Sequence, residues 1–318
     1  MTHVIDLQMV VAADLEALWE REVRIWRERL FWDISERIAT LRRFIERHGV
    51  QGVALRSGAR TVGYAYYVLS GSLGVLAGLD IAPDEVGAEG KEALLRSVVS
   101  ALRKHDITRI ESPFISFDAL WLPRVFEAEG FRTYWREFLR IRADEPLKPS
   151  QTLQTIHLEP WQEGNLPEAA TLMHAAYDGE VDTEMSQLYR KVSGCRLVLE
   201  HILHHRNSGK PVGAASAFVR HRGQGIGFIV ITEIAARQGH LAQVVVHPAY
   251  QRQGVGQLLL NYSLSRLAAL EFDTLSLIVS RGNAHALRLY QHMGFQAVLD
   301  FPVFTWEAEP SAAFRNRS

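Results

Sequence analysis

Residues 241–260 read LAQVVVHPAYQRQGVGQLLL, and this stretch is the most informative part of the sequence about the fold. Its β-branched start predicts a strand, and the residues after Gly254 have the pattern of an amphipathic helix. Gly254 and Gly256 lack a Cβ atom, so the backbone there can come close to a ligand. The N–H groups of the turn and of the first helical turn would attract an anion, and Gln251 and Arg252 add side-chain donors. The stretch therefore predicts a binding site for a pyrophosphate.

The glycine turn resembles the acetyl-coenzyme A loop of the GCN5-related N-acetyltransferases. The pattern of that family is Arg or Gln, two residues, Gly, one residue, then Gly or Ala. Gln251, Gly254 and Gly256 match it position for position. A second stretch at 283–295, NAHALRLYQHMGF, is similar to the family's Asn-x-x-Ala-x-x-x-Tyr-x-x-x-Gly-Phe. Two motifs in the right order make the resemblance specific.

The resemblance implies an α/β fold with a mixed, mostly antiparallel sheet flanked by helices, and acetyl-coenzyme A (acetyl-CoA) as co-substrate. In the family, the strand before the loop diverges from its neighbour, and its free backbone groups bond the pantetheine amides. The valines of that strand would supply these groups; alternatively they are core residues, and both roles are compatible. The residues that the resemblance assigns to the cofactor are Val244, Val245, Val246, Gln251, Arg252, Gln253, Gly254, Val255, Gly256, Gln257 and Asn283.

The chain also repeats itself in sequence. Pro83 and Pro248 each follow a β-rich run, and each is followed at nearly the same interval by a Gly-Phe pair, at 130–131 and at 294–295. We call the separation of the two prolines the repeat offset. A further match pairs Gly63 with Gly213. If these two glycines correspond, the second half carries extra residues between Gly213 and the strand that precedes the glycine turn. The repeat predicts two tandem domains of the same fold.

The expected boundaries follow from the repeat and from prolines. We expect one domain at residues 1–143, a linker at 144–154, a second domain at 155–308 and a tail at 309–318. The linker contains two prolines and mixed charge, which suit neither a helix nor a central strand. The family resemblance covers the second domain in sequence and the first only in the order of its elements.

The first half departs from the family pattern after Pro83. Asp84, Glu85 and Glu89 place three carboxylates where phosphates would lie, and like charges oppose anion binding. Phe126 stands where the second half has Tyr290. We therefore expect a degenerate copy that keeps the fold and has lost the cofactor. Tandem arrangements of this kind, such as that of mycothiol synthase, are known in the family.

Catalysis is expected in the second half. Tyr290 occupies the family's tyrosine position, which implies a general acid for the leaving thiolate; the alternative is a core aromatic residue. For the base, His240 at the start of the loop strand has a suitable ordinary pKa, and Glu233 or a chain of waters is the alternative. His240 could equally be a hairpin residue. The family transfers the acyl group directly, so Cys195 is not required.

The acidic loop at 177–184, YDGEVDTE, lies in a region that borders the acceptor pocket in the family. Four acids would attract an ammonium group, although a solvated surface loop is also compatible with this composition. The three histidines at 201, 204 and 205 have no carboxylate at ligand spacing, so no metal site is expected.

Composition sets the broad class. The 35 basic and 36 acidic residues nearly cancel, which argues against a broad nucleic-acid surface. There is one cysteine, no signal-peptide pattern and no apolar run of about 18 residues, so a cytoplasmic protein without membrane contact is expected, as a monomer or homodimer.

The expected function is transfer of acetyl from acetyl-CoA to a small-molecule or peptide amine. A non-catalytic acyl-CoA sensor and an acyltransferase for longer acyl groups are the alternatives. Retention of Tyr290 favours an enzyme.

Overall fold

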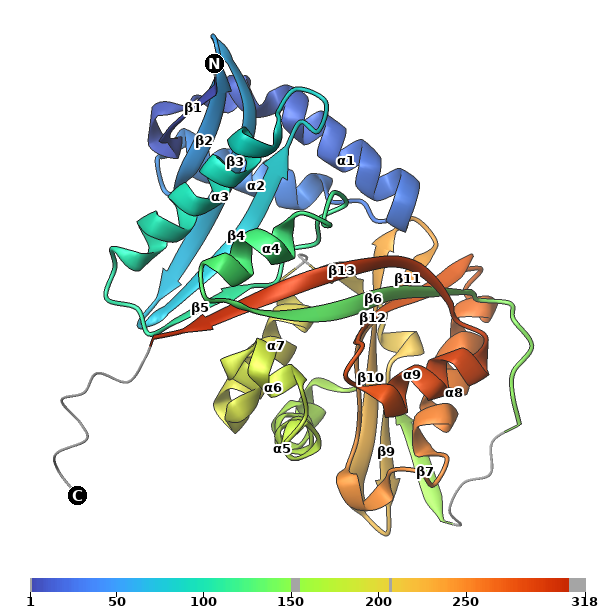
Figure 1. The fold of residues 1–318 in the computed structure, drawn as a ribbon. Helices are drawn as coiled ribbons and strands as arrows, with labels where there is room; N and C mark the ends of the chain where they lie inside the picture. The colour runs from blue at the N-terminus through green and yellow to red at the C-terminus, as the bar shows by residue number, and fades with distance from the viewer. Residues whose placement is uncertain (1, 150–154, 206–207, 309–318) are drawn as a thin grey trace, which may run out of the picture. The chain divides into compact units, whose positions relative to one another are not determined.

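The computed structural model describes residues 2–149, 155–205 and 208–308 (Figure 1). The chain divides into two compact units. Unit 1 combines the residues up to Glu22, the range Ile38–Tyr134 and the residues from Phe301 onward, and unit 2 combines Val23–Arg37 with Trp135–Asp300. Each unit is a mixed, mostly antiparallel sheet flanked by helices, which confirms the predicted α/β fold class.

The sheet of unit 1 has the strand order β1-β2-β3-β4-β5-β13, in which only the β4–β5 pair is parallel. Its strands are β1 (Thr2–Asp6), β2 (Gln51–Ser57), β3 (Arg60–Ser70), β4 (Leu73–Ile81), β5 (Arg109–Ser112) and β13 (Gln296–Glu307). The helices of the first part of the chain are η1 (Leu7–Met9), η2 (Ala12–Leu15), α1 (Glu16–Leu30), α2 (Ser35–Glu46), α3 (Ala88–Arg103) and α4 (Leu122–Ala128).

The sheet of unit 2 has the order β6-β12-β11-β10-β9-β7, and only β11–β12 is parallel. Its strands are β6 (Arg132–Arg142), β7 (Ile156–Pro160), β9 (Ala217–His221), β10 (Gln224–Ala235), β11 (Gln238–Val246) and β12 (Thr274–Ser280), with the short β8 (Lys210–Pro211) beside β10. Its helices are η3 (Glu163–Asn165), α5 (Leu166–Tyr177), α6 (Asp182–Met185), η4 (Gln187–Arg190), α7 (Val192–His204), η6 (Gly213–Ala215), η7 (Pro248–Tyr250), α8 (Val255–Ala269) and α9 (Ala284–Met293).

Helices cover both faces of the unit 2 sheet, with α8 and α9 on one face and α5 and α7 on the other (Figure 1). The central strand β10 accordingly has no polar side chain from Gly225 to Ile231. Ile229 and Ile231 pack into the core under α8, whereas Phe228 and Val230 pack into the core under α5 and α7. A strand buried on both faces needs such a continuous apolar run.

The internal repeat is present in the fold at the predicted repeat offset, except for the match of Gly63 with Gly213. Strands β4 and β11 are equally long, and β5 begins after β4 at the same interval at which β12 begins after β11. The pairing of Gly63 with Gly213 is wrong, because Gly63 lies in β3, whose counterpart is β10, whereas Gly213 begins η6. The extra residues of the second half therefore lie before β9, and not between the hairpin and β11, the strand that precedes the glycine loop.

The two halves exchange their closing strands. Residues Arg136–Arg142 of β6 pair with β12 in unit 2, and Phe304–Glu307 of β13 pair with β5 in unit 1. The compact units therefore differ from the linear ranges 1–143 and 155–308. Each closing strand follows the last helix of its own half and covers the open edge of the other half's sheet, an edge that would otherwise expose unpaired backbone groups. The expected tail, and residues 150–154 of the expected linker, lie outside the described residues.

Candidate functional site

The parallel strands β11 and β12 separate partway along their length. They pair from Gln238 with Thr274 to Leu241 with Leu277, and no further. At the same point the β10–β11 register shifts and leaves Ala242 unmatched, which is a β-bulge. Beyond it, β11 is paired with β10 alone among the described strands. We call the divergence of Ala242–Val246 from Ile278–Ser280 the strand splay of unit 2.

The glycine loop lies at the end of the splayed strand. The side-chain amide of Gln251 donates to the carbonyl of Val246 at 3.3 Å, which ties the loop to the strand. Arg252 and Gly254 have φ of +60° and +80°. The helix α8 then begins without a side-chain cap and without an acidic residue in its first turn. Its first N–H groups consequently lack the usual internal partner and suit an anion.

Gly256 lies in the first turn of α8, where it faces α9. A Cβ atom there would lie 3.2 Å from Leu289 Cδ2, which is a tight contact. The sequence predicted a close backbone approach at this position, and the structure shows close packing against the neighbouring helix. A Cβ atom alone would require the Leu289 side chain to shift slightly, and a larger side chain would require a larger shift.

The remaining predicted cofactor residues have visible structural roles. Val244 and Val246 pack into the core under α8, and Val245 packs into the core under α5 and α7. The Gln257 amide donates to the carbonyls of Lys148 and Pro149, so its side chain holds the linker. Two other side chains bond the backbone locally: Gln253 donates to Ala249 O at 2.8 Å, and Asn283 accepts from Ala286 N at 3.0 Å as the cap of α9.

Tyr290 is buried on α9, and 5% of its surface is exposed. Its ring packs edge-on against Phe295, with ring centroids 5.6 Å apart. Its hydroxyl makes no hydrogen bond with any residue of the described part of the chain. Burial, with a contribution from the Asp182 carboxylate, raises the pKa of the phenol, which therefore keeps its proton at neutral pH. The group can donate a proton to a nearby atom that develops negative charge.

His240 is enclosed by aromatic rings. Its ring lies 4.8 Å from that of Trp32 and 6.1 Å from that of Phe138, and its Nδ1 lies 3.0 Å from Ser276 Oγ. Burial, together with the positive charge of Arg136, lowers the pKa of His240 to about 3. A ring that remains neutral and enclosed is a poor choice for the general base.

Glu233, the other candidate base, lies near the hairpin between β10 and β11. It is paired opposite Gly239, and its carboxylate accepts from Arg237 N at 3.1 Å. The loop glycines follow the other end of β11. The structure therefore does not bring Glu233 to the glycine loop.

Four polar residues lie where the splay meets the helices α5 and α6. The sequence interpretation had two of them, Tyr177 and Asp182, in the acidic loop, and it missed Gln243 and Ser280. On the β11 side of the splay, Gln243 Nε2 donates to Tyr177 Oη at 2.7 Å. On the β12 side of the splay, Ser280 Oγ donates to Asp182 Oδ1 at 3.0 Å. The acidic loop at 177–184 was a signal for this region, but the pattern did not distinguish buried Asp182 from its exposed neighbours.

Unit 1 contains a splay of the same kind. Strands β4 and β5 pair only from Leu73 with Arg109 to Val75 with Glu111. The β3–β4 register shift leaves Ala77 unmatched, and Ala77 and Ala242 are related by the repeat offset. Both halves therefore keep the bulge and the separating parallel strands.

The helix that follows the unit 1 splay begins differently. Helix α3 has Gly87 at its N-cap with φ of −71°, and Glu89 in its first turn. The preceding turn is held by an ion pair of Glu85 with Arg60 at 3.0 Å. A carboxylate in the first turn interacts favourably with the helix dipole of its own chain, which leaves less attraction for an external anion.

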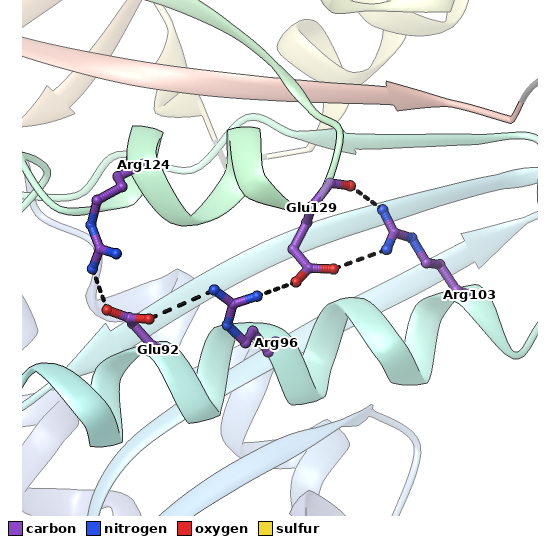
Figure 2. Close-up of polar contacts among 5 residues, drawn as sticks. All are labelled: Glu92, Arg96, Arg103, Arg124 and Glu129. Atoms are coloured by element: carbon purple, nitrogen blue, oxygen red, sulfur yellow. Dashed lines mark hydrogen bonds and ion pairs between the residues drawn. The ribbon is translucent and has the colours of Figure 1, made fainter.

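A row of charged side chains joins α3 to the end of α4 in unit 1 (Figure 2). We call it the charge ladder: Arg124, Glu92, Arg96, Glu129 and Arg103, in that order. Glu129 accepts from Arg96 at 2.5 Å and from Arg103 at 3.0 Å. In unit 2, the Glu92 and Arg96 positions are taken, at the repeat offset, by Gln257 and Asn261, which bond linker carbonyls.

Comparison with known proteins agrees with this geometry. Residues 135–295 match the Acetyltransferase (GNAT) family. A solved GCN5-related N-acetyltransferase from Sphaerobacter thermophilus has the same fold over 97% of this chain and 96% of its own, with a TM-score of 0.70 and 15% identity. A tandem GNAT protein from the clavulanic acid biosynthesis pathway covers 82% of this chain and 84% of its own, with a TM-score of 0.54 and 18% identity. The chain belongs to the GNAT N-acetyltransferase family.

Curated relatives include the ribosomal protein bS18-alanine N-acetyltransferases of Escherichia coli and Salmonella typhimurium. They are 38% and 35% identical to this chain over 65 residues, which is 20% of this chain. The chain spans 44% of the length of these relatives.

Two kinds of feature are absent from the described residues. No group of three or more His, Cys, Asp or Glu side chains within residues 2–149, 155–205 and 208–308 is arranged to hold a metal ion. Among the same residues, no helix has the length and apolar character to cross a membrane.

Proposed function

We propose that unit 2 is an acetyl-CoA-dependent N-acetyltransferase that transfers acetyl directly to an amine. The observation that carries the proposal is the strand splay. It offers the unpaired backbone of Ala242–Val246 on one side of β11, and it leads to the uncapped N-terminus of α8. The pantetheine amides would bond the free strand, and the pyrophosphate would bind the α8 N–H groups beside Arg252.

The chemistry follows from the position of Tyr290. A neutral acceptor nitrogen attacks the thioester carbonyl, a carbon–nitrogen bond forms, the carbon–sulfur bond breaks, and the proton that the nitrogen loses passes to water. The leaving thiolate takes the proton of the Tyr290 hydroxyl, which is free of other partners in the described structure, and the phenolate regains a proton from water. The backbone N–H groups that follow the bulge at Ala242 would donate to the carbonyl oxygen as it becomes negative.

The direct route also assigns no role to the single cysteine. Cys195 is buried in the core under α5 and α7, and burial raises the pKa of its thiol to about 11. A thiol in that state does not act as a nucleophile at neutral pH. We therefore propose direct transfer without an acyl-enzyme.

In unit 1 we propose a copy of the domain that no longer binds acetyl-CoA. Support comes from the acidic first turn of α3 and from the charge ladder, which ties α3 to α4. Phe126, the counterpart of Tyr290, stacks on Phe304 with ring centroids 3.8 Å apart and carries no hydroxyl.

Release of free thiol from acetyl-CoA in the presence of an amine panel tests the proposed activity. The panel contains alkylamines, amino sugars, amino acids and peptides with a free N-terminus. We expect at least one amine to accelerate thiol release by the wild-type protein, with loss of the acceleration in Tyr290→Phe. Tight binding of acetyl-CoA with no amine-dependent release would instead indicate a non-catalytic acyl-CoA-binding protein.

A further inference from the structure

Asp182 is a buried carboxylate with spare hydrogen-bonding capacity. It begins α6, and 8% of its surface is exposed. Its Oδ1 accepts from Ser280 Oγ at 3.0 Å and lies 3.9 Å from an Arg136 nitrogen. Within the described residues, its Oδ2 accepts no hydrogen bond. A buried carboxylate whose acceptor positions are incompletely used is costly unless another donor reaches it.

The carboxylate lies where both arms of the unit 2 splay meet the helical layer. Ser280, its partner, is the last residue of β12, beyond the end of the β11–β12 pairing. On the other arm, Gln243 holds the hydroxyl of Tyr177, whose ring stacks on Tyr189 with centroids 4.5 Å apart. The splay, which would receive the thioester, thus opens toward one carboxylate and two tyrosines.

A second group points to a ligand in the same place. Tyr290 has 5% of its surface exposed, and its hydroxyl has no partner among the described residues. Burial raises the pKa values of both Tyr290 and Tyr177, and the negative charge of Asp182 adds to both shifts. Neither Tyr290 Oη nor Asp182 Oδ2 is among the fully enclosed polar atoms that lack a partner, so a ligand with both a donor and an acceptor can reach them.

We infer that Asp182 recognises the acceptor, and that the acceptor binds as a cationic aliphatic amine whose ammonium group donates to Asp182 Oδ2. The inference rests on the proposed function, since it assumes that the thioester lies in the splay. Ser280 and Arg136 fix the carboxylate from one side and leave its second oxygen for the substrate. An amine that is neutral at the assay pH gains less from this carboxylate, because charge-assisted hydrogen bonds are the stronger ones.

The test compares three variants on two kinds of acceptor. Asp182→Asn keeps the size and an acceptor for Ser280 but removes the charge, and Asp182→Glu keeps the charge. The control is Asp106→Asn, the same charge change at an exposed acid of unit 1, outside the acidic loop. Steady-state kcat/KM is measured at neutral pH with alkylamines, which are cationic, and with arylamines, which are neutral.

We expect Asp182→Asn to lower kcat/KM for alkylamines by roughly ten- to a hundredfold, mainly through KM, as for loss of a hydrogen bond to a charged group. Arylamine turnover and acetyl-CoA affinity should change by less than about twofold, and Asp106→Asn should match the wild type. Asp182→Glu should retain a preference for alkylamines, which separates loss of charge from loss of folding.

Two results would overturn the inference while leaving the proposed function intact. One is an active wild type whose Asp182→Asn variant loses alkylamine and arylamine activity equally, which would make Asp182 structural. The other is an Asp182→Asn variant with full alkylamine activity. A wild type that binds acetyl-CoA but uses no amine at all would contradict the proposed function itself.

Discussion

The two splays of this chain show what a repeated fold retains and what it loses. Both units keep the β-bulge and the diverging parallel pair, with Ala77 and Ala242 related by the repeat offset. They differ at the helix that follows. Helix α8 starts with a left-handed glycine, no acid and no cap, whereas α3 starts with an acid in its first turn.

We propose that core packing preserves the splay and that the loop determines binding. The strands around each splay are buried and cannot easily change. The first helical turn is at the surface, so a few substitutions there alter its charge without unfolding the sheet. The predictions below test this separation, beginning with the largest expected effect.

Substitution of the loop glycines gives the sharpest contrast between the units. Gly254→Val forces a β-branched residue into φ near +80°, and Gly256→Val crowds Leu289. Each should raise the acetyl-CoA dissociation constant by about a hundredfold or more, which corresponds to roughly 3 kcal/mol. Gly87→Ala in unit 1 is the matched control, since a Cβ there meets nothing within 4 Å. Calorimetric titration of the three variants checks this, and unchanged affinity in the loop variants would remove the loop from the site.

Tyr290→Phe removes the hydroxyl group that Phe126, at the matching position of unit 1, also lacks. It should lower kcat by about 10²–10⁴-fold, the usual range for a general acid, and leave acetyl-CoA affinity nearly unchanged. Because burial raises the pKa of the Tyr290 phenol, its ionisation should not appear in the rate profile near neutral pH. Full activity of the phenylalanine variant would assign Tyr290 to packing.

His240 should affect stability and not the pH dependence of the rate. Its folded-state pKa of about 3 lies below the ordinary value near 6.5, so the unfolded state binds the extra proton between these values. The stabilisation is present above about pH 6.5 and is lost as pH falls toward 3, by at most about 1.4 kcal/mol per pH unit. Unfolding of His240→Gln by urea across this range should show a shallower pH slope. An acid limb of kcat that disappears in this variant would restore His240 as the base.

The charge ladder of unit 1 gives the smallest expected effect (Figure 2). Glu129→Gln removes two partly exposed ion pairs, with Arg96 and Arg103. The free energy of unfolding should fall by about 1 kcal/mol or less, and salt should reduce the difference. Thermal unfolding at low and high salt measures this, and acetyl-CoA affinity serves as the control. A weakened affinity would place the ladder in the binding function.

Much of the fold and of the glycine loop could be predicted from sequence because the signals are local. The loop is contiguous, and glycine spacing with a following amphipathic helix specifies its geometry. The strand exchange could not be predicted, because β6 and β13 have similar sequence patterns. Neither pattern indicates which sheet edge the strand covers. His240 appeared accessible at a hairpin because the residue that encloses it, Trp32, is far away in sequence.

The acceptor side was the least predictable part. Asp178, Asp182 and Glu184 are close in sequence and equivalent in composition, and only the fold shows that Asp182 is buried against Ser280. The misalignment of Gly63 with Gly213 had a similar cause, because a short Val-Gly match carries less information than the common register of whole strands.

The stoichiometry of acetyl-CoA binding tests the central contrast between the units most directly. Calorimetric titration of the full-length protein should give one acetyl-CoA per chain, because only α8 presents an uncapped, acid-free N-terminus after a splay in the described parts of the two units. Gly256→Val should abolish that single site. Two equivalent sites, or one site that survives in Gly256→Val, would contradict the account.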